Sequence, residues 1–138
     1  MKTQVLSIEQ MQHLIELGVD TSKTKMAWYA IYETLPNWYN ELRIRDDVFD
    51  RNYPSVPTFT LQDMLEMMPY DIKVPNNPEV EGRFYRFQLR KLLMPNYEIR
   101  YIDWEDTIFI SICNEDLLTC TYEALCWLVE NKYIGGKK

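Results

Sequence analysis

The chain has 138 residues, of which 46% are hydrophobic and 26% charged, with only four glycines and seven prolines. This composition excludes disordered, collagen-like and low-complexity proteins and indicates a folded globular protein. The length suits one domain, so we expect a single domain over residues 1–138. No apolar run approaches the ~20 residues of a membrane span, and the first residues lack the pattern of an export signal. We therefore expect a soluble, cytoplasmic protein with no membrane partner.

The charges are unevenly distributed along the chain. Fifteen basic and twenty-one acidic residues give a net charge of −6, which opposes binding to a polyphosphate. Residues 83–102, however, carry five basic side chains and one acidic side chain, a local charge of +4 between two acidic regions. Two interpretations stay open: a surface on which neighbouring elements complement one another, or a basic face that docks an acidic partner.

The beginning of the chain predicts one helix and two strands. Ser7 and Gln10 have the spacing of a capping box, and the apolar stripe after them predicts a helix over residues 8–17. Aromatic and aliphatic residues alternate over 26–33, which is typical of a strand. A shorter strand is expected over 41–45.

The next segment predicts a loop followed by a helix. Residues 46–57 contain two prolines and several Asp and Asn residues, so we expect a long loop without regular strand pairing. Thr60 and Asp63 have near-capping-box spacing and predict the start of a second helix, which Pro69 ends.

The second half of the chain predicts mainly strands. A short strand is expected over 70–74, and period-two alternation then predicts an antiparallel meander of three strands over 84–93, 97–104 and 107–113. Asn114 is expected to cap a final helix over 115–132. Together these elements predict an α+β fold: one antiparallel sheet of about five strands, covered on one face by three helices.

The histidine, cysteine and glycine content excludes most familiar catalytic motifs. His13 is the only histidine, so no motif with two histidine ligands can form, and we expect it to be exposed on its helix. Cys113, Cys120 and Cys126 lack C-x-x-C spacing, so we expect free or buried thiols and neither a zinc site nor a disulfide framework. The four glycines form no phosphate-binding loop, dinucleotide fingerprint or nucleophile elbow. We expect no catalytic residue, no metal and no cofactor.

Two alternative functions rest on local patterns. A metal-dependent nuclease would use Asp71 and Lys73 on one strand face, with Asp50 as a second ligand for Mg²⁺. An RNA-binding module would use the interleaved basic and aromatic residues 82–87. Acidic residues are so numerous that about one pattern of the first kind is expected by chance. The second lacks the spacing of a known RNA-binding motif, so we do not expect a nucleic-acid partner.

Four segments carry a resemblance to a known family: residues 6–11 (LSIEQM), 17–23 (LGVDTSK), 56–63 (VPTFTLQD) and 122–127 (YEALCW). They are similar to a family of small uncharacterised proteins of gut bacteria and their phages or mobile elements. The resemblance covers both ends and the middle of the chain and implies a cytoplasmic, accessory role. It brings no catalytic motif and no known activity to this sequence.

The remaining hypothesis is a non-enzymatic protein that binds an unidentified protein partner or a second copy of itself. We expect the partner on the polar sheet face that carries Arg86, Gln88 and Arg90, together with the 46–57 loop. Two large amphipathic rings, Trp38 and Tyr39, are further candidates, because such rings anchor protein interfaces.

Overall fold

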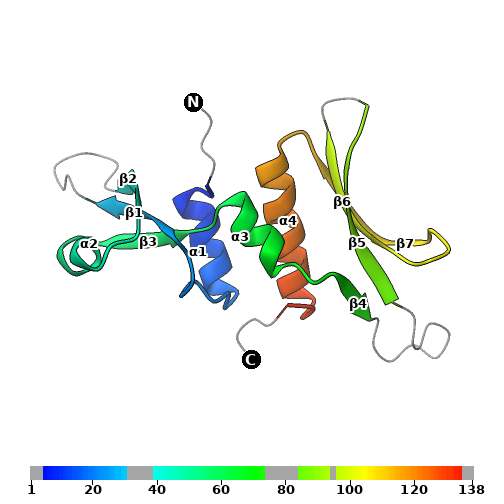
Figure 1. Cartoon of the computed structure of the whole chain (residues 1–138), viewed down its shortest axis with the longest axis horizontal. Helices are drawn as coiled ribbons and strands as arrows, with labels where there is room; N and C mark the ends of the chain where they lie inside the picture. The colour runs from blue at the N-terminus through cyan, green and yellow to red at the C-terminus, as the bar shows by residue number, and fades with distance from the viewer. Residues whose placement is uncertain (1–4, 31–38, 74–83, 94–95, 135–138) are drawn as a thin grey trace. The chain divides into compact units, whose positions relative to one another are not determined.

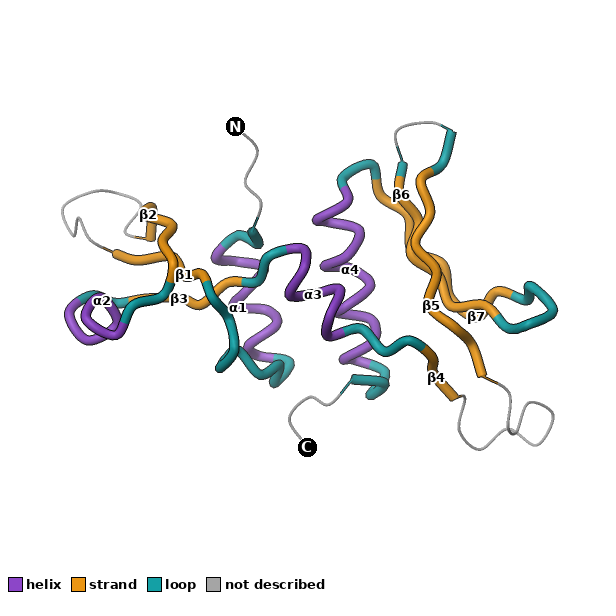
Figure 2. Tube along the Cα trace, viewed as in Figure 1, coloured by secondary structure: helices purple, strands orange, loops and turns teal. Residues whose placement is uncertain are grey.

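The computed structural model describes residues 5–30, 39–73, 84–93 and 96–134, which contain seven strands and four helices (Figure 1). The chain divides into two compact units, Met1–Leu65 with Gly135–Lys138, and Glu66–Ile134. Each unit contains one antiparallel sheet (Figure 2). The α+β class is confirmed, whereas the expected single sheet of about five strands is wrong. The expectation of one domain stays a prediction.

The first unit contains a three-stranded sheet with strand order β2-β1-β3. Its elements are α1 (Ile8–Glu16), β1 (Met26–Ala30), β2 (Tyr39–Ile44), α2 (Asp47–Asn52) and β3 (Ser55–Thr58), followed by the start of α3 (Leu61–Met67). The predicted capping box starts α1: Gln10 N donates to Ser7 Oγ at 3.2 Å, and Ser7 N donates to Gln10 Oε1 at 2.9 Å. His13 is exposed on α1, as expected.

The core of the first unit forms where α1 lies against β3. Leu6 supplies its backbone carbonyl to two side chains, Trp28 Nε1 at 3.0 Å and Thr58 Oγ1 at 2.8 Å. These bonds satisfy buried polar groups and fix the segment before α1 on the sheet. The fully or nearly fully buried apolar side chains of this core include Leu6, Met11, Leu14, Ala27, Tyr29 and Phe59.

The predicted loop over 46–57 is wrong, because it contains α2 and most of β3. Asp46 caps α2 by accepting from Val48 N at 2.7 Å, so a short helix forms between the two strands. Pro57 lies inside β3, opposite Ala27. It is tolerated because β3 is the edge strand of its sheet and has one free side.

The second unit contains a four-stranded sheet with strand order β4-β5-β6-β7. Its strands are β4 (Asp71–Lys73), β5 (Phe84–Lys91), β6 (Tyr97–Ile102) and β7 (Ile108–Asn114), and α4 (Leu117–Glu130) contacts β6 and β7. The predicted meander is confirmed by the antiparallel pairing of β5 with β6 and of β6 with β7. The sequence PNNP over residues 75–78 is typical of a turn, and it lies outside the described residues.

The predicted cap of the last helix is wrong. Asp116, not Asn114, is the N-cap of α4 and accepts from Thr119 N at 3.0 Å. Asn114 ends β7, and its side chain accepts from Asp116 N at 2.8 Å. The sheet ladder therefore extends to the residue expected to begin the helix.

Candidate functional site

The candidate site is the face of the four-stranded sheet away from α4, which we call the open face. Directly opposed residues in an antiparallel pair share one face of a sheet, and side chains alternate along each strand. The register therefore places twelve side chains on the open face: Asp71, Lys73, Phe84, Arg86, Gln88, Arg90, Glu98, Arg100, Ile102, Ile108, Ser111 and Cys113.

The other face of the sheet packs apolar side chains under α4. Ile99 and Tyr101 of β6 are almost fully buried there. Phe109 of β7 stacks on Tyr85 with 4.8 Å between ring centroids and meets Trp127 of α4 edge-on at 5.9 Å. The predicted alternation of a buried and a wet face is therefore present, although burial is uneven along β5: Tyr85 is buried and Leu89 is 38% exposed.

A polar network centred on Glu98 organises the open face. Arg90 contacts Glu98 Oε1 through Nη2 at 2.7 Å and donates to it from Nε at 2.8 Å. Ser111 donates its hydroxyl to the other oxygen of the same carboxylate. Arg100 Nε lies 4.0 Å from Glu98 Oε1 and donates to Gln88 Oε1 at 2.5 Å. Side chains from three neighbouring strands thus meet around one carboxylate.

Glu98 stays ionised in this network although its side chain is only 8% exposed. Burial raises the pKa of Glu98, but the hydrogen bonds from Ser111 and Arg90 and the charges of Arg90 and Arg100 together outweigh burial and lower it. The carboxylate is therefore negative at neutral pH. It holds the two guanidinium groups in fixed positions across the sheet.

The open face is basic although its chain is acidic. Four cations share it with two carboxylates, Asp71 and Glu98; the cations are Lys73, Arg86, Arg90 and Arg100. The side chain of Arg90 is 42% exposed in spite of its ion pair, and Arg86 is exposed four residues away on the same strand. Glu98 therefore neutralises one positive charge, and an excess of cations stays on the surface, while docking of an acidic partner stays a prediction.

Only part of the predicted site is assembled here. Gln88 and Arg90 join the network, and Arg86 shares their face. Trp38 lies outside the described residues, and Tyr39 begins β2 in the first unit. Sequence reasoning missed Glu98, Arg100 and Ser111. Alternation places each of them on the polar side of its own predicted strand, 97–104 or 107–113, but does not show that these sides join the face of Arg86.

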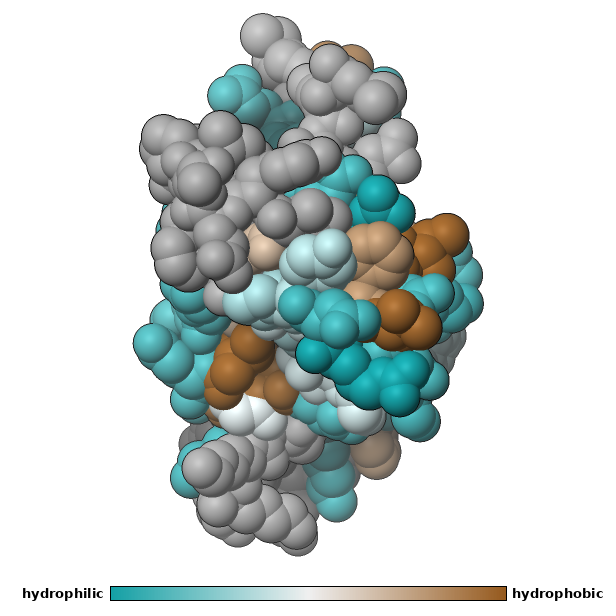
Figure 3. All heavy atoms as spheres, turned by 90° about the vertical axis from the view of Figure 1, so that its left-hand side faces the viewer, coloured by the Kyte–Doolittle hydropathy of each residue, from teal (hydrophilic) through white to brown (hydrophobic). Residues whose placement is uncertain are grey.

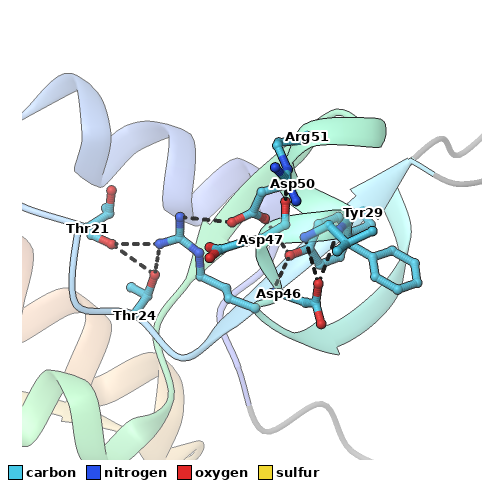
Figure 4. A network of polar contacts seen from close by, with 10 residues as sticks. Thr21, Thr24, Tyr29, Asp46, Asp47, Asp50 and Arg51 are labelled. Atoms are coloured by element: carbon cyan, nitrogen blue, oxygen red, sulfur yellow. Dashed lines mark hydrogen bonds and ion pairs between the residues drawn. The ribbon is translucent and has the colours of Figure 1, made fainter.

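Residues 46–57, which were expected to form a binding loop, are held on the first sheet by polar contacts (Figure 4). The hydroxyl of Tyr29 donates to Asp50 Oδ1 at 2.5 Å, and Arg45 Nη2 lies 3.6 Å from Asp50 Oδ2. Arg45 also donates to Thr24 Oγ1 at 2.9 Å and to the Thr21 carbonyl at 3.3 Å. These contacts fix α2 on the first sheet.

The surface around α2 offers no continuous apolar patch among the residues described there. Figure 3 shows that the hydrophobic areas on this side are separated by hydrophilic atoms. The large exposed apolar side chains of β2 and α2 are Ile44 and Val48. Scattered single apolar residues are normal on protein surfaces, so this side gives no signal of a docking site.

The three residues of the alternative nuclease site belong to two different units. Asp50 belongs to the first unit and is bonded to Tyr29 and Arg45. Asp71 and Lys73 are exposed on the short strand β4. Within the described ranges no group of three His, Cys, Asp or Glu residues is placed to hold a metal ion.

The three cysteines differ in their exposure to solvent. Cys113 is exposed on β7, whereas Cys120 and Cys126 are buried in α4. Burial raises the pKa of the Cys120 thiol, and it raises the pKa of Cys126 to about 11, so both thiols are protonated at neutral pH. Cys120 Sγ donates to the Ile112 carbonyl of β7 at 3.3 Å. These two cysteines are packing residues.

Comparison with known proteins gives no relative: no family model, no curated protein and no solved structure matches the chain. No helix in the described part of the chain is long and apolar enough to cross a membrane.

Proposed function

We propose that the protein is a non-enzymatic binding protein whose open face docks an acidic segment of a protein partner. One observation carries the proposal: Arg90 and Arg100 are held around a buried carboxylate, with Arg86 and Lys73 on the same face, in a chain of net charge −6. Charge segregation of this kind favours association with an oppositely charged surface and increases the association rate.

The chemistry of the face favours a protein over a nucleic acid. Arginine is enriched at the centres of protein interfaces because its planar group binds carboxylates through two hydrogen bonds. Stacking of bases would need exposed rings beside the arginines. Tyr85 is buried under α4, so Phe84, which is 52% exposed, is the single ring that the described strands place on this face, and stacking of successive bases would need more than one.

The spacing of the cations suits an extended acidic peptide. Arg86 and Arg90 are four residues apart on β5, about 13 Å at the rise of a strand. Gln88 lies between them on β5 and Arg100 lies opposite Gln88 on β6. A segment with acidic residues on alternate positions could pair with these groups in turn.

The proposal is tested by fluorescence anisotropy with a labelled peptide of alternating Glu and Tyr residues and a matched Lys and Tyr peptide. We expect the wild-type protein to bind the acidic peptide, with affinity that falls as salt is added, and not the basic one. Arg86→Glu and Arg90→Gln should each weaken binding by about tenfold or more.

The matched control is Arg51→Glu on α2, which makes the same charge change on the first unit. It should leave the affinity within about twofold. Equal losses for Arg51→Glu and Arg86→Glu would show a non-specific charge effect and contradict the proposal. Absence of binding to the acidic peptide at low salt would contradict it as well.

A further inference from the structure

The four edge strands of the two sheets differ in how they are protected from pairing with another chain. An unprotected edge strand presents free backbone N–H and C=O groups, and proteins block such edges with charges, prolines, bulges or very short strands. β2 carries Glu41 and Arg43, and β3 has four residues with Pro57 among them. β4 has three residues, two of them charged.

The edge strand β7 lacks most of this protection. Its seven residues, Ile108–Asn114, include no charge and no proline. One irregularity is present: Phe109 is an extra residue between Ile108 and Ile110, opposite the step from Tyr101 to Ile102. Such a bulge hinders pairing at the beginning of the strand. The register is regular over 110–114, so five residues keep an edge that can pair.

The apolar side chains along β7 are partly exposed, which indicates that the sheet could accept a further strand at this edge. Ile99 and Tyr101 of the neighbouring β6 are 2% and 1% exposed. Their partners on the helix side of β7, Ile112 and Ile110, are only half-buried. The apolar layer under α4 therefore continues to the edge of the sheet. No strand in the described part of the chain covers it.

We propose that β7 pairs with β7 of a second copy in an antiparallel, two-fold symmetric dimer. The partner strand must be uncharged and must bring apolar side chains to the helix side, and β7 itself meets both requirements. A two-fold axis at Ile112 sets Ile110 and Ile112 of both copies in one layer and pairs Ser111 with Cys113 on the open face. An interface of this kind closes on itself and leaves no free copy of the edge.

The dimer brings no strong repulsion between the basic faces. β7 carries only uncharged side chains on the open face, so the nearest arginine strands of the two copies, β6 and its counterpart, are three strand spacings apart. This is about 14 Å, longer than the ~8 Å screening length at physiological salt. The joined sheet of eight strands presents both basic faces on one side.

The test is sedimentation velocity of the full chain over a range of concentrations in the presence of reductant. We expect a concentration-dependent dimer. Cys113→Lys places a charge on the exposed side of β7 and should weaken association by about tenfold or more. Cys113→Ser should leave association unchanged, because the thiol takes no part in a covalent link.

Ile44→Lys on the exposed side of β2 is the matched control and should leave association unchanged. Hydrogen exchange provides a second readout: amides of residues 110–114 should become more protected as protein concentration rises, whereas those of β2 should not. A chain that is monomeric at all concentrations would overturn the proposal. A dimer that Ile44→Lys dissociates and Cys113→Lys does not would also overturn it. Neither result depends on the acidic-peptide experiment.

Discussion

The described residues include two arginine–carboxylate networks, and these direct their arginines to different partners. In the first unit, Arg45 binds Asp50, a threonine hydroxyl and a backbone carbonyl, while Asp50 accepts from the buried Tyr29. In the second unit, Arg90 and Arg100 bind side chains of their own sheet face. The same residue types thus tie chain segments together in one place and display cations in the other.

The difference lies in which partners use the donors of each guanidinium group. An arginine has five N–H donors in a planar fork. Two donors of Arg90, from Nε and Nη2, are directed at one oxygen of Glu98, and its side chain is 42% exposed. The hydrogen bond from Arg45 to a backbone carbonyl anchors a loop. Arg45 cannot turn to another partner without disrupting that loop. An ion pair on an open sheet face leaves donors for a partner.

The largest expected effect comes from breaking the first network at Tyr29. Tyr29→Ala removes a fully buried ring that packs edge-on against Phe49 of α2 at 5.6 Å. We expect a loss of about 3–5 kcal/mol in the free energy of unfolding, measured by denaturant titration. Tyr29→Phe keeps the ring and removes the bond to Asp50, so it should cost about 1–3 kcal/mol.

Tyr70→Ala provides the control for these variants, because Tyr70 is 75% exposed. Its effect should stay within about 0.5 kcal/mol. If Tyr29→Phe were equally harmless, the hydroxyl of Tyr29 would not be part of a structural network. The contrast between the two units would then disappear.

Glu98→Gln should have a smaller effect, and its effect on peptide affinity distinguishes simple charge attraction from positioning of the arginines. The substitution removes a negative charge from the basic face, so simple attraction predicts tighter binding of the acidic peptide. If Glu98 instead positions Arg90 and Arg100, the peptide should bind more weakly by about threefold to tenfold. Stability should fall by about 1–3 kcal/mol, because two part-buried arginines lose their carboxylate.

Asp71→Asn is the matched control for Glu98→Gln. It makes the same charge change on the same face, at an exposed position of β4. We expect unchanged or slightly tighter peptide binding, measured by the same anisotropy titration. Equal behaviour of the two variants would show that the network supplies charge alone and that Glu98 has no positioning role.

The local parts of the fold were predictable from sequence. The Ser7 and Gln10 pair marks the start of α1 because a capping box depends on residues three positions apart. Alternation likewise revealed β5, β6 and β7. The assignment of strands to two sheets was not predictable, because period-two patterns carry no information about which strands are neighbours. Asp46 could have signalled α2, but the prolines after it favoured a loop.

The candidate site was predictable only along one strand. Arg86, Gln88 and Arg90 share a face by alternation, which a single sequence shows. Their partners depend on the register between β5 and β6, which is set by the turn between them and by packing under α4. Glu98 was therefore missed. A lone carboxylate in a basic segment was nevertheless a usable signal, since ionised acids are buried only when paired.

The smallest expected effects are pH-dependent, and they separate the two networks at opposite ends of the scale. The pKa of Glu98 lies below its ordinary value of 4.5. Its contribution is complete above the unfolded-state pKa and is lost as pH falls through the lowered value. The difference in unfolding free energy between wild type and Glu98→Gln should therefore shrink below about pH 4.5. A difference that stays constant into acid would contradict the ionised state of Glu98.

The first network should respond at the alkaline end. Burial, followed by the hydrogen bond to Asp50, raises the pKa of Tyr29 above its ordinary value of 10.0. A raised folded-state pKa means that the contribution is complete below the unfolded-state pKa and is lost as pH rises through the folded-state value. The stability gap between wild type and Tyr29→Phe should thus persist through neutral pH and decline above about pH 10. Because no proton leaves Tyr29 on the acid side, loss of stability there in the Glu98→Gln variant comes from other carboxylates, and the acid titration of that variant measures how large their contribution is.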